Sequence, residues 1–439
     1  MFTARLLMTA AGLLMAFGAS SATVTVITSF PKELTAAYKA AFEKINPDIT
    51  LEILNKNTVA GISFVRESGI GQRPEIFWAS APDAFEVLAR DNLLSSGASL
   101  KNPSIPDKIG SYPINDPQGM YLGQALAGYG IMYNTRYLKA HKLAAPKQWE
   151  DLLSAQWFGH VGITAPSRSG TMHLTVETIL QGQGWDAGWN SLLRMSGNSA
   201  AVTERSFGVP DGVNSGQFGA GPVIDFFGLS GKYSGFPVEF NYPLDTAIVP
   251  ANIALIADSK NPADAKKFIS FALSQEGQEL LLSPKISRLP VLPYSDMKGK
   301  VPAQYPDPAE LAARSKVQFD TELSTQRYYI VQTLFDQTIT FRLKELQAAT
   351  KAIWEAERKL GSQASGPKAE LLKKAKTLAF SPVINAKQLN DAEFVKIFSA
   401  NKKDAEVNKA ITQLESEWNT RARENYNQAR TLANEAMRP

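Results

Sequence analysis

Residues 162–184 have the sequence GITAPSRSGTMHLTVETILQGQG, which predicts a strand end, a polar loop and a helix in succession. The apolar start is typical of a buried strand, and apolar side chains recur at helical spacing from Met172 to Leu180 before glycines end the helix. The first N–H groups of a helix have no intrahelical partner and carry partial positive charge. The stretch therefore predicts an anion site at Ser169, Gly170 and Thr171. Simple capping of the helix by Ser169 or Thr171 is the alternative.

The composition is that of an ordered protein with sizeable cores. The chain has 439 residues, of which 44% are hydrophobic and 20% charged, enough for about two or three domains. Its formal net charge of +4 is small and evenly spread, which argues against nucleic acid as a partner. Cysteine is absent, which excludes disulfides, thiolate nucleophiles and cysteine-ligated metal centres.

The N-terminus predicts export. Met1–Arg5 is a short basic segment, Leu6–Ala19 is an apolar segment too short to span a bilayer, and Ser20–Ala22 is typical of a cleavage site. We therefore expect a signal peptide over residues 1–22 and a periplasmic mature protein. A retained membrane anchor is the alternative.

Strand and helix patterns alternate after the signal peptide. Strands are predicted at residues 23–27, 49–54 and 75–78, with helical patterns between them, as in an α/β domain with a mostly parallel sheet. Ligands of such sheets bind beyond the C-terminal strand ends, which here carry Ser29, Thr58 and Ser80. We expect these hydroxyls to face a common cleft, although each is also a candidate helix cap.

Two further features lie toward the C-terminus. The apolar run at residues 221–224 ends in Asp225, a carboxylate that needs partners if it is buried. From residue 308 the pattern becomes helical throughout. This region is expected either to pack on the preceding lobe or to extend as an arm.

Several motifs together resemble an extracellular solute-binding protein of an ABC importer, of the branch that binds ferric ion, hexose phosphates and phosphoglycerate. They are AGYGIMYN at 127–134, TAPSRSGT at 164–171, GQFG at 216–219 and the segment 242–250. The resemblance is sharpest to phosphoglycerate-sensing proteins, over ERSFGVPDGV at 204–213 and IDFFG at 224–228.

The resemblance implies a two-lobed α/β fold of the periplasmic-binding-protein type II, with an all-helical C-terminal extension. Lobe 1 would comprise residues 23–125 and 247–305, lobe 2 residues 126–246, and the extension residues 306–439. A ligand would bind between the lobes, and a closed, liganded form would be recognised at the membrane.

The expected ligand is a small phosphorylated organic anion, such as phosphoglycerate or a sugar phosphate. Arg205 would add a bidentate charge to the phosphate, or alternatively form only a surface ion pair, and Asp225 would contact ligand hydroxyls. His173 is a further candidate, although a structural role is favoured for it. The full predicted ligand set is Ser29, Thr58, Ser80, Ser169, Gly170, Thr171, Arg205, Ser206 and Asp225.

Partners and competing functions follow from the same resemblance. An inner-membrane ABC permease is the expected partner, and a sensor role that feeds a membrane kinase is the alternative. No cofactor and no metal are expected. Ferric-binding members carry a tyrosine pair where this chain has Phe226 and Phe227, which offer no oxygen to iron.

A serine acylase is the competing enzyme class. Ser29 to Lys32 match the S-x-x-K motif of such enzymes, but the supporting S-D-N and K-T-G motifs are absent. The proline and lysine of this segment more simply begin a helix. The sequence therefore favours a binding protein over an enzyme.

Overall fold

The computed structural model describes residues 22–303, 305–361, 365–399 and 404–438. The predicted signal peptide lies outside the described residues, apart from Ala22, which begins the first strand. Within the described ranges, no helix combines the length and the hydropathy that a membrane crossing needs.

A mixed sheet forms the centre of the molecule. Its strands are β1 (Ala22–Thr28), β2 (Ile49–Asn55), β3 (Ile76–Ala79), β4 (Leu94–Ser95), β7 (Leu122–Asn134), β8 (Val161–Thr164), β9 (Ser199–Thr203), β10 (Ala220–Ile224), β11 (Val238–Asn241), β12 (Ile248–Ile256) and β13 (Leu289–Pro290). The strand order is β2-β1-β3-β12-β7-β10-β8-β9, with β11 and β13 on β7 and β4 on β12. A separate small hairpin pairs β5 (Lys108–Ile109) with β6 (Tyr112–Pro113).

The long strand β7 belongs to both halves of the sheet. Its first half pairs with β12, as at Ala127 opposite Val249, and its second half pairs with β10 and β11. The glycines of this strand permit close approach, because a Cβ on Gly130 would lie 2.2 Å from the carbonyl oxygen of Asn241. Two lobes therefore share one crossing strand. The lobe boundaries given by the resemblance stay predictions.

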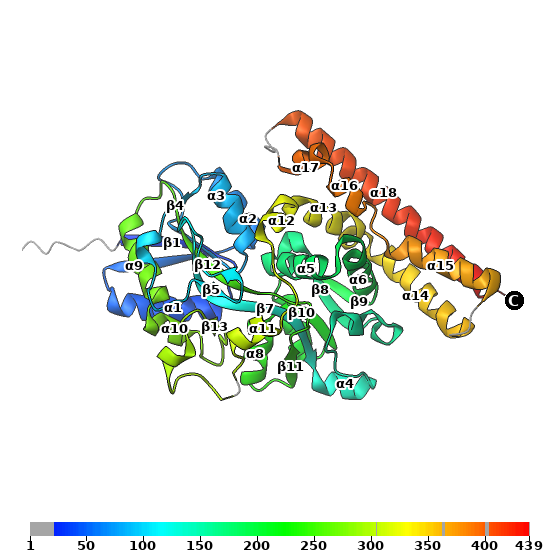
Figure 1. Ribbon diagram of the computed structural model, residues 1–439, viewed down its shortest axis with the longest axis horizontal. Coiled ribbons are helices and arrows are strands. Elements are labelled where there is room, and N and C mark those ends of the chain that lie inside the picture. Colours follow the sequence, from blue (N-terminus) through cyan, green and yellow to red (C-terminus); the bar gives the residue numbers. More distant parts are fainter. Residues whose placement is uncertain (1–21, 304, 362–364, 400–403, 439) are drawn as a thin grey trace, which may run out of the picture.

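Helices cover each half of the sheet (Figure 1). Lobe 1 carries α1 (Lys32–Ile45), α2 (Thr58–Glu67), α3 (Pro82–Arg90), α9 (Pro262–Leu273) and α10 (Gln275–Leu280). The helix α11 (Pro308–Arg314), which falls within the predicted extension, packs beside β12 and β5 of lobe 1. Lobe 2 carries α4 (Thr135–His141), α5 (Gly170–Gln183), α6 (Trp185–Gly197), α7 (Gly208–Ser215) and α8 (Asp225–Tyr233). The loop after β2 ends at Asn57, whose side chain caps α2 by accepting the Ala60 N–H.

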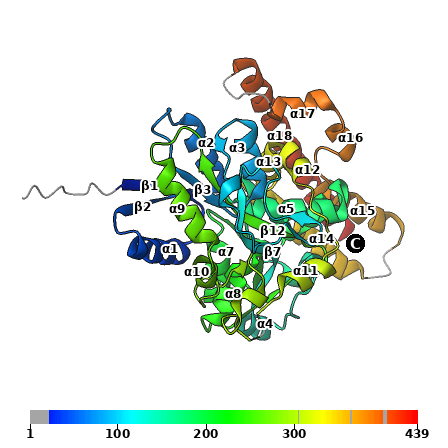
Figure 2. The same cartoon turned by 60° about the vertical axis from the view of Figure 1, so that its left-hand side comes forward.

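The C-terminal extension is helical, as the periodicity predicts. Its helices are α12 (Thr321–Gln326), α13 (Tyr328–Thr338), α14 (Leu343–Leu360), α15 (Gly366–Phe380), α16 (Ala386–Leu389), α17 (Ala392–Ser399) and α18 (Ala405–Ala436). Figures 1 and 2 both place α12 and α13 beside α3 and α5, while α14, α15 and α18 run together along the outside of the molecule.

The extension packs on lobe 2 rather than standing free. One continuous apolar core runs from the strands of lobe 2 into α14, α15 and α18. Polar anchors reinforce it: Trp354 Nε1 donates to Asn198 Oδ1 at 2.8 Å, and Trp185 Nε1 donates to the carbonyl oxygen of Ile384 at 3.0 Å. Of the two expected arrangements, the structure has the packed one, and it makes lobe 2 and the extension one body.

Candidate functional site

Seven of the nine predicted site residues come together where the two lobes meet. Lobe 1 supplies the loop after β1 and the first residue of α2, and lobe 2 supplies the start of α5 and the loop after β9. We call these residues the anion cradle: Ser29, Thr58, Ser169, Gly170, Thr171, Arg205 and Ser206.

The start of α5 combines the two roles considered from the sequence, a side chain that caps the helix and backbone N–H groups that can bind an anion. Ser169 is the N-cap, and its Oγ accepts the Met172 N–H at 3.1 Å, so this side chain does cap the helix. The His173 N–H bonds the Ser169 carbonyl oxygen at 2.9 Å. The N–H groups of Gly170 and Thr171 precede the first intrahelical bond, and both residues line the cradle. An anion there meets two backbone donors and the positive end of the helix dipole.

Arg205 reaches across the cleft from lobe 2. Its Nη2 donates to Asn55 Oδ1 of lobe 1 at 3.0 Å, and its guanidinium lies 5.0 Å from the ring centre of Phe207. Among the described residues, no carboxylate lies within ion-pair distance of it. The surface ion pair considered as the alternative is made instead by the neighbouring residues Arg168 and Glu204, at 3.4 Å.

The lobes are nearly closed over the cradle. A Cβ added to Gly170 would lie 2.6 Å from Thr58 Oγ1, and the cavity holds only about 10 Å³. The two lobes must therefore part to admit a ligand the size of a phosphate group.

Ser80 and Asp225 do not line the cradle. Ser80 is buried, and its Oγ accepts a hydrogen bond from Arg288 Nη1 at 3.1 Å. Asp225 Oδ2 accepts from the Gly128 N–H at 2.7 Å and from the Tyr242 hydroxyl at 3.1 Å, next to the crossing strand β7. Burial raises the pKa of Asp225 to about 7. In this structure Asp225 ties the crossing strand to lobe 2, a role that accounts for its burial.

Arg288 was not among the site residues predicted from the sequence. It is 1% exposed, and the rings of Phe30 and Phe226 lie 4.0 and 3.7 Å from its guanidinium carbon. Its Nε and Nη2 are buried and have no partner within the described part of the chain. Burial lowers its pKa to about 9, so the group keeps its charge at neutral pH. The signal in the sequence was an arginine inside the mainly apolar stretch 286–292.

Arg288 lines a second cavity of the same cleft, of about 250 Å³. A small gap of about 10 Å³ lies beside both, lined by Ser169, Thr171 and Ser206 of the cradle and by Phe227 of the Arg288 cavity. Arg205 and Arg168 therefore line the cradle, and Arg288 lines the neighbouring cavity.

His173 has a structural role, as the sequence favoured. It is fully buried in α5, and its Nε2 lies 3.1 Å from Asp83 Oδ2 of α3, across the lobe boundary. Ser324 of α12 donates to the same Asp83 oxygen at 2.9 Å. One buried polar cluster thus joins lobe 1, lobe 2 and the extension.

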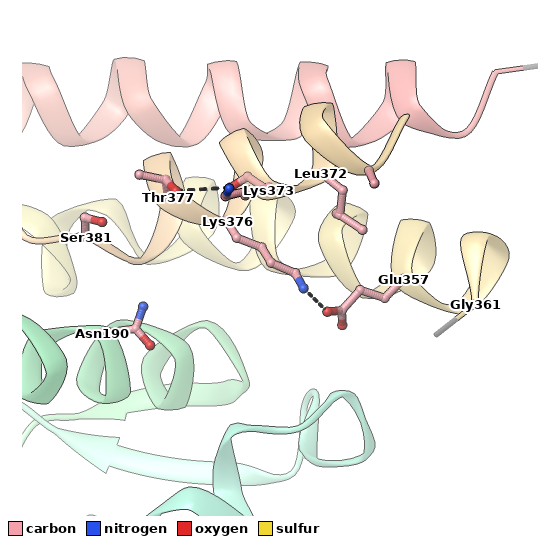
Figure 3. Close-up of a pocket in the computed structure, with 9 residues that line it drawn as sticks. Asn190, Glu357, Gly361, Leu372, Lys373, Lys376, Thr377 and Ser381 are labelled. Atoms are coloured by element: carbon pink, nitrogen blue, oxygen red, sulfur yellow. Dashed lines mark hydrogen bonds and ion pairs between the residues drawn. The ribbon is translucent and has the colours of Figure 1, made fainter. Parts of the chain in front are cut away.

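A larger cavity of about 590 Å³ lies away from the cleft, between α6, α14 and α15 (Figure 3). Lys376 in its wall forms an ion pair with Glu357, so this positive charge is neutralised within the protein. None of the predicted site residues lines this cavity. The described part of the chain holds no group of three or more acidic or histidine side chains arranged for a metal ion.

Comparisons with known proteins cover most of the chain. Residues 72–312 match the family described as bacterial extracellular solute-binding protein. The phosphoglycerate transport regulatory protein PgtC of Salmonella typhimurium is 29% identical over 345 residues, which cover 78% of this chain and 83% of the relative.

Solved structures share the fold. The periplasmic binding protein AfuA of Actinobacillus pleuropneumoniae, with exogenous fructose-6-phosphate bound, has a TM-score of 0.65 at 17% identity and covers 73% of this chain and 99% of its own. The apo ferric ion-binding protein A of Pasteurella haemolytica has a TM-score of 0.58 at 16% identity, covering 73% and 98%. The predicted two-lobed α/β fold is confirmed, and the helical extension is present.

Proposed function

We propose that this chain, which belongs to the bacterial extracellular solute-binding proteins, captures a small phosphorylated organic anion between its lobes. The cradle is the observation that carries the proposal. A helix N-terminus from lobe 2, hydroxyls from both lobes and an arginine without a carboxylate partner converge on one point. Phosphate is the group best matched to backbone N–H donors combined with a guanidinium.

The relative that is similar over most of the chain supports a phosphorylated ligand, although the structural neighbours include a ferric ion-binding protein as well. The PgtC relative carries phosphoglycerate transport in its name, and the AfuA structure holds fructose-6-phosphate. Phe226 and Phe227 occupy the place of the tyrosine pair expected in a ferric site, and Phe226 packs against Arg288 instead. A cationic, aromatic environment disfavours Fe³⁺ and favours an anion.

Binding would work by closure. Each lobe supplies part of the cradle, so a ligand that contacts both lobes stabilises the closed form over the open one. We propose that the exported protein presents this closed form to an inner-membrane ABC permease. The helical extension supports a second candidate, a sensor that acts on a membrane kinase, because it adds an outer surface fixed to lobe 2.

The test is a calorimetric titration of the purified protein with phosphoglycerates, hexose phosphates, the parent sugars and ferric ion. We expect binding of phosphorylated compounds alone. Arg205→Ala should weaken them at least tenfold, about 1.4 kcal/mol, because it removes a charge-assisted hydrogen bond. Arg136→Ala is the matched control, since it removes an exposed arginine of α4 in the same lobe. Binding of ferric ion without any phosphorylated compound, or equal effects of the two variants, would contradict the proposal.

A further inference from the structure

We propose that Arg288 is a second anion anchor, which binds a carboxylate at the opposite end of the ligand from the phosphate. The inference rests on the proposed function and narrows it. The ligand is then a phosphorylated carboxylic acid with an acidic group at each end, rather than a sugar phosphate with one.

The first argument is an unmatched buried charge. Arg288 is 1% exposed, and among the described residues its guanidinium donates a hydrogen bond only to the neutral hydroxyl of Ser80. Within the same part of the chain, the charge of Asp225 is near enough to interact with Arg288, but it forms no hydrogen bond or ion pair with it, and its oxygens are bonded to Gly128, Tyr242 and Phe226 instead. A buried, unpaired charge costs several kcal/mol. A ligand carboxylate would supply the missing partner.

The second argument is the geometry of the unused atoms. Nε and Nη2 lie on one edge of a guanidinium and together bind a carboxylate through two parallel hydrogen bonds. The chain contains its own example of this pairing. Arg327 holds Glu177 with the same two atoms, Nε at 2.9 Å from Oε1 and Nη2 at 2.7 Å from Oε2. In Arg288 this edge has no partner among the described residues.

The third argument concerns shape and surroundings. Phe30 and Phe226 cover the two faces of the guanidinium, so a partner must approach in its plane, which suits a flat carboxylate. Lys285 lines the same cavity and adds positive charge. The two carboxylates of the cavity wall, Glu33 and Asp211, are both exposed to solvent.

The fourth argument is position. The cradle and the Arg288 cavity are neighbours, since one small gap is lined both by Ser169 and Ser206 of the cradle and by Phe227 of the Arg288 cavity. A short ligand held by its phosphate at the cradle therefore extends toward Arg288 when the lobes part to admit it.

A matched pair of ligands tests the anchor. Glycerol 3-phosphate and 3-phosphoglycerate share the phosphate and the three-carbon chain. Glycerol 3-phosphate has a hydroxymethyl group where 3-phosphoglycerate has its carboxylate. We expect wild-type protein to bind 3-phosphoglycerate at least tenfold more tightly by calorimetry. Arg288→Lys keeps the positive charge but removes the pair of parallel N–H donors, and Arg288→Met removes both the charge and the donors. Each Arg288 variant should bind 3-phosphoglycerate only as tightly as glycerol 3-phosphate. The affinity for glycerol 3-phosphate itself should change less than twofold.

The controls separate the possible failures. Arg205→Ala should weaken both compounds alike, because it acts on the phosphate they share. If wild-type protein binds both compounds equally, or if the Arg288 variants weaken both equally, the anchor is wrong and the cradle stands. If neither compound binds, the proposed function fails and the anchor with it. Thermal unfolding establishes that each variant is folded, and the wild-type ratio alone decides the question if neither Arg288 variant folds.

Discussion

Asp225→Asn is expected to remove a large pH dependence from the stability of the protein. Asp225 is 1% exposed and follows β10 directly, where it holds the Gly128 N–H of the crossing strand and the Tyr242 hydroxyl. Burial raises its pKa from 3.8 to about 7, and these hydrogen bonds only partly offset that rise. An asparagine keeps one oxygen to accept the bonds from Gly128 and Tyr242, loses the acceptor for the Phe226 N–H at every pH, and does not ionise.

The sign follows from proton linkage. Between pH 4 and 7 the folded protein binds the Asp225 proton more tightly than the unfolded chain does, so protonation stabilises the fold. This stabilisation is complete below the unfolded pKa and is lost as the pH rises through the folded pKa. With pKa values of 3.8 and about 7, the loss between pH 5 and pH 7.5 is on the order of 2.5 kcal/mol, at about 1.4 kcal/mol per pKa unit.

Urea denaturation at pH 5 and pH 7.5 measures this loss. The free energy of unfolding of wild-type protein should fall by about 2.5 kcal/mol more than that of Asp225→Asn over this interval. Glu67→Gln, which changes an exposed carboxylate, should behave as wild type. An equal pH dependence in wild type and Asp225→Asn would refute the argument that burial controls this carboxyl group.

Three further predictions concern closure and the extension. Gly170→Ala should lower the affinity for phosphorylated ligands without lowering the melting temperature, because its Cβ would lie 2.6 Å from Thr58 Oγ1 only when the lobes are closed; unchanged affinity in calorimetry would contradict this. Glu177→Gln should cost about 3–5 kcal/mol in urea denaturation, because it leaves the charge of Arg327 buried without its partner, and a loss below about 1 kcal/mol would argue against a buried pair. Deleting α14–α18 should expose the apolar core shared with lobe 2 and yield aggregated protein, whereas a soluble monomer in size-exclusion chromatography would show that lobe 2 folds alone.

The cradle was largely predictable because its signals are local. Ser169, Gly170 and Thr171 lie at a strand–loop–helix junction that hydrophobic periodicity and breaker residues mark in the sequence. Ser29 and Thr58 follow predicted strands, and parallel strands bring their C-terminal ends to one edge of a sheet. The structure adds that Ser169 caps its helix, so the backbone of the next two residues remains for a ligand.

Ser80 and Asp225 show where the same reasoning stops. Both follow strands, as predicted, yet each faces a partner distant in sequence: Arg288 for Ser80, and Gly128 with Tyr242 for Asp225. Local patterns place a residue at a strand end, but they do not say which neighbour will occupy its hydrogen bonds.

The sequence by itself determined the alternation of strands and helices, the loop that starts α5 and the helical nature of the extension, because each depends on the spacing of side chains a few residues apart. Only the tertiary structure decided that α14–α18 pack on lobe 2, that Asp83, His173 and Ser324 meet, and that the charge of Arg288 is buried between two rings. These contacts join segments up to about 250 residues apart, as Ser324 and Asp83 do across 241 positions. Burial and charge pairing arise from such contacts, so no local period in the sequence encodes them.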